Sequence, residues 1–184
     1  MLSLEEQKIL MDIARNALNG FVREARIPSF DHESYPEALF CKSGAFVTLH
    51  KNGRLRGCIG RLNSEDALYK LVRDMTISAA TRDHRFKAVT TNELDEITLE
   101  ISVLTVPVRI DNISEIELGK HGIYIKKGMS SGTFLPGVGI KTGWNLEQLL
   151  GHCARDKAHI GWNGWKDAEI YTYETESFRE EDLS

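Results

Sequence analysis

The stretch Gly44-Ala-Phe-Val-Thr-Leu-His-Lys-Asn-Gly-Arg-Leu-Arg-Gly-Cys-Ile-Gly60 contains two runs of strand-forming residues around Asn52-Gly53. Asn-Gly is the dipeptide that best tolerates positive φ at both central positions of a type I′ turn. The stretch therefore predicts a β-hairpin with a two-residue loop.

A two-residue loop also predicts which residues share a face of the hairpin. Leu49 then lies opposite Arg56, and Val47 lies opposite Cys58, all on one side of the ribbon. A guanidinium among apolar neighbours must find a carboxylate or a ligand anion to offset its desolvation. The pattern points to a site at Arg56 and Cys58 without naming its reaction.

Length and net charge limit the number of domains and the kinds of ligand that are expected. The chain has 184 residues, 41% of them hydrophobic, which suits one domain or two intimately packed lobes. The net charge of −4 and the pI near 5.9 leave no overall basic footprint, so nucleic-acid binding is not expected.

Cysteine usage and the N-terminal residues bear on the compartment. Cys41, Cys58 and Cys153 are odd in number and lack Cys-x-x-Cys spacing, which argues against a disulfide framework or a zinc ribbon. The chain begins without a basic region followed by an apolar run, and no window is long and apolar enough to span a bilayer. We expect a cytoplasmic protein that does not enter a membrane.

Three helices are predicted from apolar periodicity and capping residues. The first begins with a capping box at Ser3 and Glu6 and stops near Asn19-Gly20. The second occupies residues 65–80, and the third follows a cap at Asn145 and buries Cys153.

Strands alternate irregularly with these helices. The clearest is Ile97–Leu104, which alternates apolar and polar residues. A strand at 119–126 leads into a second hairpin that turns at 128–132, and residues 133–143 predict one short strand and a glycine-rich loop. Residues 168–178 predict a single final strand at a sheet edge. The pattern predicts an α+β fold with a largely antiparallel sheet.

Three local motifs do not support a cofactor or a metal. Gly128–Gly132 matches Gly-x-Ser-x-Gly, but its flanks predict a hairpin instead of the strand and helix that a nucleophile elbow requires. The glycines of 137–143 miss the dinucleotide-binding fingerprint. His152 and Cys153 are adjacent on a predicted helix, so their side chains diverge by about 100° and cannot easily share a metal ion.

One hypothesis for the site is catalytic. Cys58 is then a thiolate nucleophile whose pKa is lowered by Arg56 or Arg85, and His84 or His121 is the general base. Alternatively, Cys58 is a small core residue without reactivity.

A second hypothesis is ligand binding. Arg56 or Arg85 would clamp a carboxylate or phosphate in a pocket roofed by residues 137–143. Alternatively, Arg56 forms a structural ion pair with Glu100 or Asp83. The predicted ligand-binding residues are Arg56, Gly57, Asp83, Arg85 and Glu100.

The same residues carry a family resemblance. Leu55-Arg-Gly-Cys-Ile-Gly60 resembles the signature hexapeptide of the AMMECR domain family, which is also known as component A of the Memo and radical-SAM trio in prokaryotes. The resemblance runs from about residue 4 to residue 178. Further segments similar to family motifs are Asp83-His-Arg-Phe86, Ile101-Ser-Val-Leu104, His121-Gly-Ile123, and Leu135-Pro-Gly-Val138 followed by Trp144. Gly137 stands where the family often has Gln or Glu.

The resemblance implies a single α+β domain over residues 1–184, with a larger and a smaller lobe and the hexapeptide beside a cleft between them. It implies no established activity, so whether the protein is an enzyme stays open. It also implies partners, namely a Memo-like protein, itself similar to non-haem iron dioxygenases, and a radical-SAM enzyme.

Two functions are therefore expected as alternatives. In the first, the protein binds a small anionic ligand or a modified substrate beside the hexapeptide, either as an enzyme of that trio or without chemistry. In the second, it is an adaptor that recruits partner proteins through a surface that includes Trp162 and Trp165. These tryptophans are equally expected to pack against the third helix.

Overall fold

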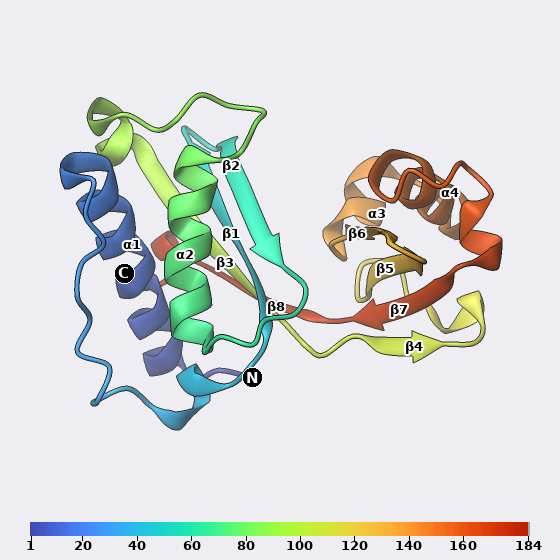
Figure 1. Ribbon diagram of the computed structural model, residues 1–184, viewed down its shortest axis with the longest axis horizontal. Helices are drawn as coiled ribbons and strands as arrows, with labels where there is room; N and C mark the ends of the chain where they lie inside the picture. Colours follow the sequence, from blue (N-terminus) through green and yellow to red (C-terminus); the bar gives the residue numbers. More distant parts are fainter. Residues whose placement is uncertain (184) are drawn as a thin grey trace. The chain divides into compact units, whose positions relative to one another are not determined.

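The computed structural model describes residues 1–183 and divides into two compact units (Figure 1). The first unit comprises residues 1–103 and 176–183, and the second comprises 104–175. Each unit contains one four-stranded antiparallel sheet with helices, so the predicted α+β class is confirmed. The sequence predicted one sheet, whereas the strands form two separate sheets, one in each unit.

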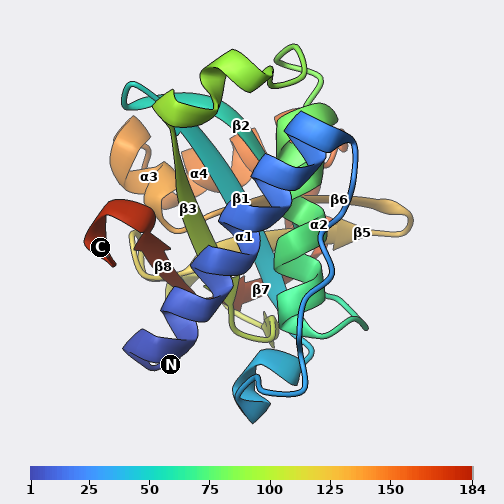
Figure 2. The same cartoon turned by 90° about the vertical axis from the view of Figure 1, so that its left-hand side faces the viewer.

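The sheet of the first unit has the strand order β2-β1-β3-β8. Helices α1 and α2 lie side by side against one face of this sheet (Figure 2). The bounds are α1 (Leu4–Glu24), α2 (Leu68–Thr81), β1 (Gly44–Lys51), β2 (Arg54–Arg61), β3 (Ile97–Leu104) and β8 (Thr175–Arg179). The core of the unit lies between this helix pair and the apolar face of the sheet.

Helix α1 begins as its sequence predicts but ends later. Ser3 and Glu6 form the capping box. The predicted end near Gly20 is wrong, because the helix continues to Glu24 and is terminated by Ala25 in the left-handed region at φ 51°. A single glycine lowers helix stability by only about 1 kcal/mol, which burial of the apolar face of α1 outweighs.

The hairpin of β1 and β2 has the predicted turn but a different register. Asn52 and Gly53 have φ values of 51° and 73°, as a type I′ turn requires. Beyond the pair His50–Leu55, however, Leu49 lies opposite Gly57 and not opposite Arg56. Arg56 is the extra residue of a β-bulge, and a shift of one residue moves every later side chain to the other face.

The sheet of the second unit has the strand order β4-β7-β5-β6. The bounds are β4 (Val108–Ile110), β5 (Gly122–Lys127), β6 (Ser130–Phe134), β7 (Glu169–Tyr173), α3 (Gly137–Thr142) and α4 (Leu146–His152). Helix α4 starts with the predicted cap at Asn145 and continues into one π-helical turn, Cys153–Lys157. Its buried leucines pack with Ile123 and Ile125 of β5 in the second core.

Two predictions for the second half of the chain are wrong. Residues 168–178 form two strands, because the chain passes at Glu174 from β7 to β8 and β8 pairs in the other sheet. Residues 137–142 form helix α3 and not a loop; Gly143, at φ 69°, terminates the helix. The hairpin turn between β5 and β6 is confirmed.

Short helical turns connect these elements. They are the 3-10 turns Glu37–Phe40, Thr91–Glu96, Ile113–Glu115, Gly164–Asp167 and Glu180–Asp182. Among the helices of residues 1–183, none is long and apolar enough to cross a membrane.

Candidate functional site

The β-bulge places Cys58 on the sheet face that points away from helices α1 and α2. Cys58 lies opposite Thr48, whose hydroxyl donates a hydrogen bond to the thiol sulfur at 3.3 Å. Val47 and Leu49 lie on the other, buried face. The prediction that Cys58 faces Val47 is therefore wrong, and Cys58 is half-buried instead of belonging to the aliphatic core.

The loop after α2 covers the free edge of β2 through Asp83. Its carboxylate accepts a hydrogen bond from the backbone N–H of Cys58 at 2.9 Å. The same carboxylate accepts two hydrogen bonds from the Arg85 guanidinium, at 2.9 Å from Nε and 2.6 Å from Nη2. These hydrogen bonds, with that from Arg85 the strongest, hold the pKa of Asp83 well below its usual range. The predicted grouping of Cys58, Asp83 and Arg85 is thus present in the structure.

The charge around Cys58 does not make it a resting thiolate. Burial is the largest influence and raises the pKa of the Cys58 thiol. The Thr48 hydroxyl and the Arg85 guanidinium act in the opposite direction, but the net change is upward. The predicted arginine-lowered pKa is therefore not found, and reaction of the thiol at neutral pH requires a base.

Arg56 pairs with Glu93, which was not among its predicted partners. Its Nε and Nη2 donate to the two oxygens of Glu93, both at 3.0 Å, and its Nη1 donates to the carbonyl oxygen of Lys87 at 2.9 Å. The prediction that Arg56 forms an ion pair with Glu100 or Asp83 is therefore wrong. Only 14% of the Arg56 side chain is exposed. Arg56 therefore ties the hairpin to the segment that precedes β3.

The two glycines of the hexapeptide are required by packing. A Cβ at Gly57 would lie 2.3 Å from the carbonyl oxygen of Ala79 in α2, so only glycine permits this close approach. A Cβ at Gly60 would lie 2.3 Å from the ring of Phe46. Gly57 is buried, and its role as a ligand-binding residue stays a prediction.

Glu100 lies on the same sheet face as Cys58, but its partners differ from those expected. Its carboxylate lies 3.3 Å from Nε2 of His50 and accepts a hydrogen bond from Nε of Arg179 at 3.2 Å. His84 is exposed on the loop beside Asp83.

His121 lies in the second unit and has its contacts there. Its Nδ1 accepts a hydrogen bond from the backbone N–H of Glu117 at 3.1 Å, and Nε2 lies 3.8 Å from the Glu174 carboxylate. Residues 137–143 also belong to the second unit. The roles of His84 and His121 as a base, and of 137–143 as a roof, stay predictions.

Three residues of this site were not identified from sequence: Thr48, His50 and Glu93. The alternation of Thr48 and His50 with Val47 and Leu49 was a usable signal, because it places both on the face opposite the core. For Glu93 the signal was Thr90-x-x-Glu, which forms a capping box in the structure.

A depression of about 410 Å³ lies on the first unit beside the hairpin turn. His50 and Arg179 line it together with polar residues of the segment that leads into β3. Its lining residues are His50, Asn52, Gly53, Asp95, Glu96, Thr98, Leu99, Arg179 and Glu181.

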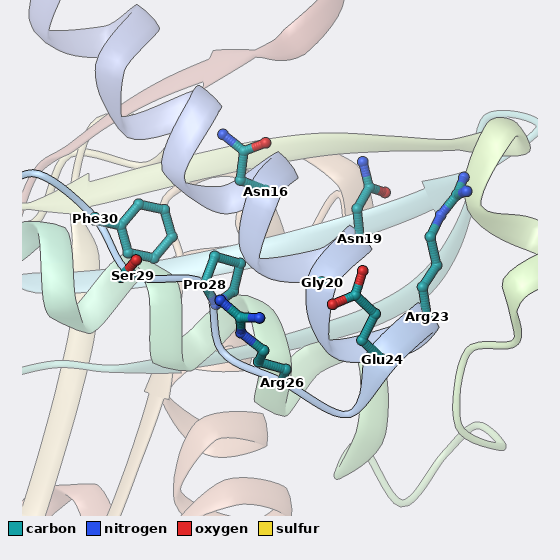
Figure 3. Close-up of a pocket in the computed structure, with 9 residues that line it drawn as sticks. All are labelled: Asn16, Asn19, Gly20, Arg23, Glu24, Arg26, Pro28, Ser29 and Phe30. Atoms are coloured by element: carbon teal, nitrogen blue, oxygen red, sulfur yellow. The ribbon is translucent and has the colours of Figure 1, made fainter.

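Another depression, of about 400 Å³, lies where the end of α1 meets the following segment (Figure 3). Asn16, Asn19 and Arg23 line it from the helix, and Arg26, Ser29 and Phe30 line it from the segment after the helix. None of the predicted site residues contributes to it.

The serine-containing glycine motif and Cys153 have structural roles in the second unit. Residues 128–132 include the β5–β6 turn, which confirms the hairpin interpretation. Cys153 is fully buried, and burial raises its pKa to about 12, which confirms a core residue. Within the described part of the chain, no group of three or more His, Cys, Asp or Glu side chains is placed to hold a metal ion.

Comparison with known proteins identifies relatives over nearly the whole chain. The family model AMMECR1 matches residues 11–178. A protein of Methanococcoides burtonii is 37% identical, with 98% of this chain and 92% of the relative covered. A protein of Thermotoga maritima is 39% identical, with 90% and 94% covered. The crystal structure of the uncharacterised protein PH0010 from Pyrococcus horikoshii superposes with a TM-score of 0.89 at 31% identity and covers 96% of this chain and 92% of that one.

Proposed function

Because the chain belongs to the AMMECR1 family and its first unit carries an arginine beside a thiol, we propose that it binds a small anionic ligand. The ligand is a free carboxylate or phosphate, or a modified substrate that carries such a group. The binding surface comprises Cys58, Asp83 and Arg85.

The observation that carries this proposal is the geometry of Arg85. Asp83 holds the guanidinium through two hydrogen bonds, while 46% of the Arg85 side chain is exposed. Nη1 of Arg85 donates to no residue in the described chain. A planar guanidinium that is already oriented loses little entropy when it binds an anion. Arg85 therefore suits an anion better than Arg56, whose donors are used by Glu93 and backbone carbonyls.

The neighbouring Asp83 carboxylate weakens anion binding at Arg85 without preventing it. Asp83 neutralises part of the charge of Arg85, which favours a weakly bound, exchangeable anion over a permanently held one. The Cys58 carbonyl also accepts from Nη2 of Arg85 at 3.4 Å, which brings a bound anion close to the Cys58 residue.

The proposal extends to the partners that the family resemblance implies. In this proposal, the anionic group belongs to a substrate that a Memo-like protein and a radical-SAM enzyme also handle. Co-expression of the three proteins and affinity capture of the tagged chain, with and without Arg85→Gln, tests the association. Equal absence of both partners from the two captures contradicts this part of the proposal and leaves anion binding untouched.

Anion binding is tested by titrating inorganic phosphate, and separately acetate, into the protein while backbone amide shifts are recorded by NMR. We expect saturable shifts at Arg85 and Cys58 with one of the two anions, which also distinguishes phosphate from carboxylate chemistry. Arg85→Gln should weaken that binding at least about tenfold, as loss of a charged hydrogen bond does. Arg54→Gln, which changes an exposed arginine on the strand that contains Cys58, is the matched control. Equal affinity in wild type and Arg85→Gln would overturn the proposal.

The adaptor function has one observation in its favour. Trp162 keeps 38% of its surface exposed, and the Arg155 guanidinium lies 5.3 Å from its ring centroid, a combination common at protein interfaces. Trp165, the other tryptophan of the expected surface, is buried in the second core and is unavailable to a partner. Trp162→Ala should abolish partner capture while phosphate or acetate binding persists, if the adaptor function is the correct one.

A further inference from the structure

A thiol, an imidazole and a carboxylate lie on one face of three neighbouring strands in the first unit. Cys58 is on β2, His50 on β1 and Glu100 on β3, and these strands are adjacent in the sheet. The alternation of buried Val47 and Leu49 in β1, and of Leu99 and Ile101 in β3, places the intervening side chains on the opposite face.

Of these three side chains, His50 is the one with a buried polar atom that makes no hydrogen bond to the described residues. Nε2 of His50 is buried and has no hydrogen-bond partner among the described residues, although the Glu100 carboxylate lies 3.3 Å away. The side chains of His50 and Glu100 are 25% and 22% exposed. A buried ring nitrogen without a hydrogen bond is rare in native proteins and calls for an explanation. A reaction in which His50 takes up a proton supplies one, because Nε2 of the resulting imidazolium would face the Glu100 carboxylate 3.3 Å away.

The register places His50 on the same sheet face as Cys58. Thr48 lies directly opposite Cys58, and its hydroxyl contacts the sulfur at 3.3 Å. His50 follows Thr48 two residues later on this face, beyond the bulge, where it lies opposite Leu55. The Glu100 carboxylate connects the two residues, because it lies 3.3 Å from Nε2 of His50 and also acts electrostatically on the Cys58 thiol.

We infer that Cys58 is a nucleophile toward an activated acyl group, with His50 as its general base and Glu100 as the residue that positions the imidazole. A neutral thiol needs such a base, which agrees with the raised pKa of Cys58. The inference rests on the proposed function only for the substrate, an ester or thioester whose anionic group Arg85 would hold.

The step balances without a further reactant. The Cys58 thiol proton passes to His50 as the sulfur forms a bond to the carbonyl carbon. The bond between that carbon and the leaving oxygen or sulfur breaks, and the leaving group departs with the electron pair. His50 returns the proton to the leaving group, so the products are an S-acyl cysteine and the free alcohol or thiol.

Charged groups on every neighbouring element enter the pH dependence of this step. Asp83 and Arg85 lie beside Cys58, and Glu100 and Arg179 lie beside His50. The depression that His50 lines adds further carboxylates, those of Asp95, Glu96 and Glu181.

The experiment measures acetylation by p-nitrophenyl acetate, from nitrophenolate release and from mass spectrometry of the cysteine peptides. The background is Cys41→Ser, since Cys41 is exposed and Cys153 is buried. We expect a stable acetyl group on Cys58 and a rate at pH 7 that falls about 100-fold in His50→Gln, the size of a typical general-base contribution. Glu100→Gln should lower the rate less, and the exposed His32→Gln should not change it.

A pH profile separates a catalytic His50 from a merely structural one. In wild type the rate should level off below pH 9, whereas in His50→Gln it should keep rising as the thiol ionises above its ordinary pKa of 9.0. Equal rates in wild type and His50→Gln, loss of the rate in His84→Gln, or no acetylation of Cys58 would each overturn the inference. The acetyl group carries no charge, so failure of anion binding at Arg85 leaves this readout unaffected.

Discussion

The Arg56 guanidinium and the Glu93 carboxylate form a bidentate ion pair, with both hydrogen bonds at 3.0 Å. Only 14% and 17% of the two side chains are exposed. The pair connects the bulged residue of β2 to the 3-10 turn that precedes β3, and it explains why an arginine at this place in the hexapeptide stabilises the fold.

Removal of Arg56 should destabilise the protein. Arg56→Met leaves the largely buried Glu93 carboxylate without its main partner, and we expect the free energy of unfolding to fall by about 2 kcal/mol. Urea unfolding followed by circular dichroism measures the change. Arg54→Met, in the exposed part of the same strand, should change stability by less than about 0.5 kcal/mol. A double-mutant cycle with Glu93→Gln should show coupling, and simple additivity would contradict the pair.

The same carboxylate should make stability depend on pH. The Arg56 guanidinium is the largest influence that lowers the pKa of Glu93, from 4.5 to about 2. Since the folded state holds the lower pKa, the stabilisation is fully present above pH 4.5 and is lost as the pH falls toward 2. Urea unfolding of wild type and Glu93→Gln at several pH values should give a stability difference that shrinks across this interval. A difference that stays constant from pH 5 to pH 2 would show that Glu93 does not titrate this way.

Gly57 should tolerate no side chain, for reasons of packing alone. The Cβ of Gly57→Ala would meet the Ala79 carbonyl oxygen at 2.3 Å, and we expect a loss of about 3 kcal/mol in unfolding free energy. Gly137→Ala is the matched control, because it lies in a helix with open space around its Cβ position. That control should be neutral or stabilising by up to about 1 kcal/mol. Thermal unfolding of both variants measures the contrast, and equal melting temperatures would refute the packing argument.

The end of α1 offers a stabilising substitution. Ala25 adopts the left-handed region at φ 51°, where an L side chain is strained and glycine is not. Ala25→Gly should raise the free energy of unfolding by about 1 kcal/mol. Lys8→Gly, an exposed interior position of the same helix, should lower it by a similar amount. A melting temperature that falls in Ala25→Gly would contradict the strained cap.

Much of the local structure was predictable because it depends on neighbouring residues. The Asn52-Gly53 turn and the caps at Ser3 and Asn145 involve contacts within four positions of the chain. The alternation in β3 likewise predicts Ile97, Leu99, Ile101 and Val103 on the core face; the first three are buried, and Val103 is partly buried. The end of α1 was not predictable in this way, because packing at Gly20 outweighs its low helix propensity.

The candidate site shows the same division. Its location beside Cys58, Asp83 and Arg85 followed from a hairpin motif and a loop rich in charge. Its partners did not follow, since a β-bulge adds one residue to a strand without a reliable sequence signal, and that residue turns Cys58 from the aliphatic face to the face of His50.

The α+β class, the hairpin turn, the starts of α1 and α4, and the family could be predicted from the sequence, since each depends on local propensity, periodicity or a contiguous motif. Only the tertiary structure decided that Arg56 pairs with Glu93, that β7 and β8 lie in different sheets, and that His50 and Glu100 share a face with Cys58. Ion pairs and strand pairing join residues that are far apart in the chain. A single bulge also moves every side chain beyond it to the other face of the sheet.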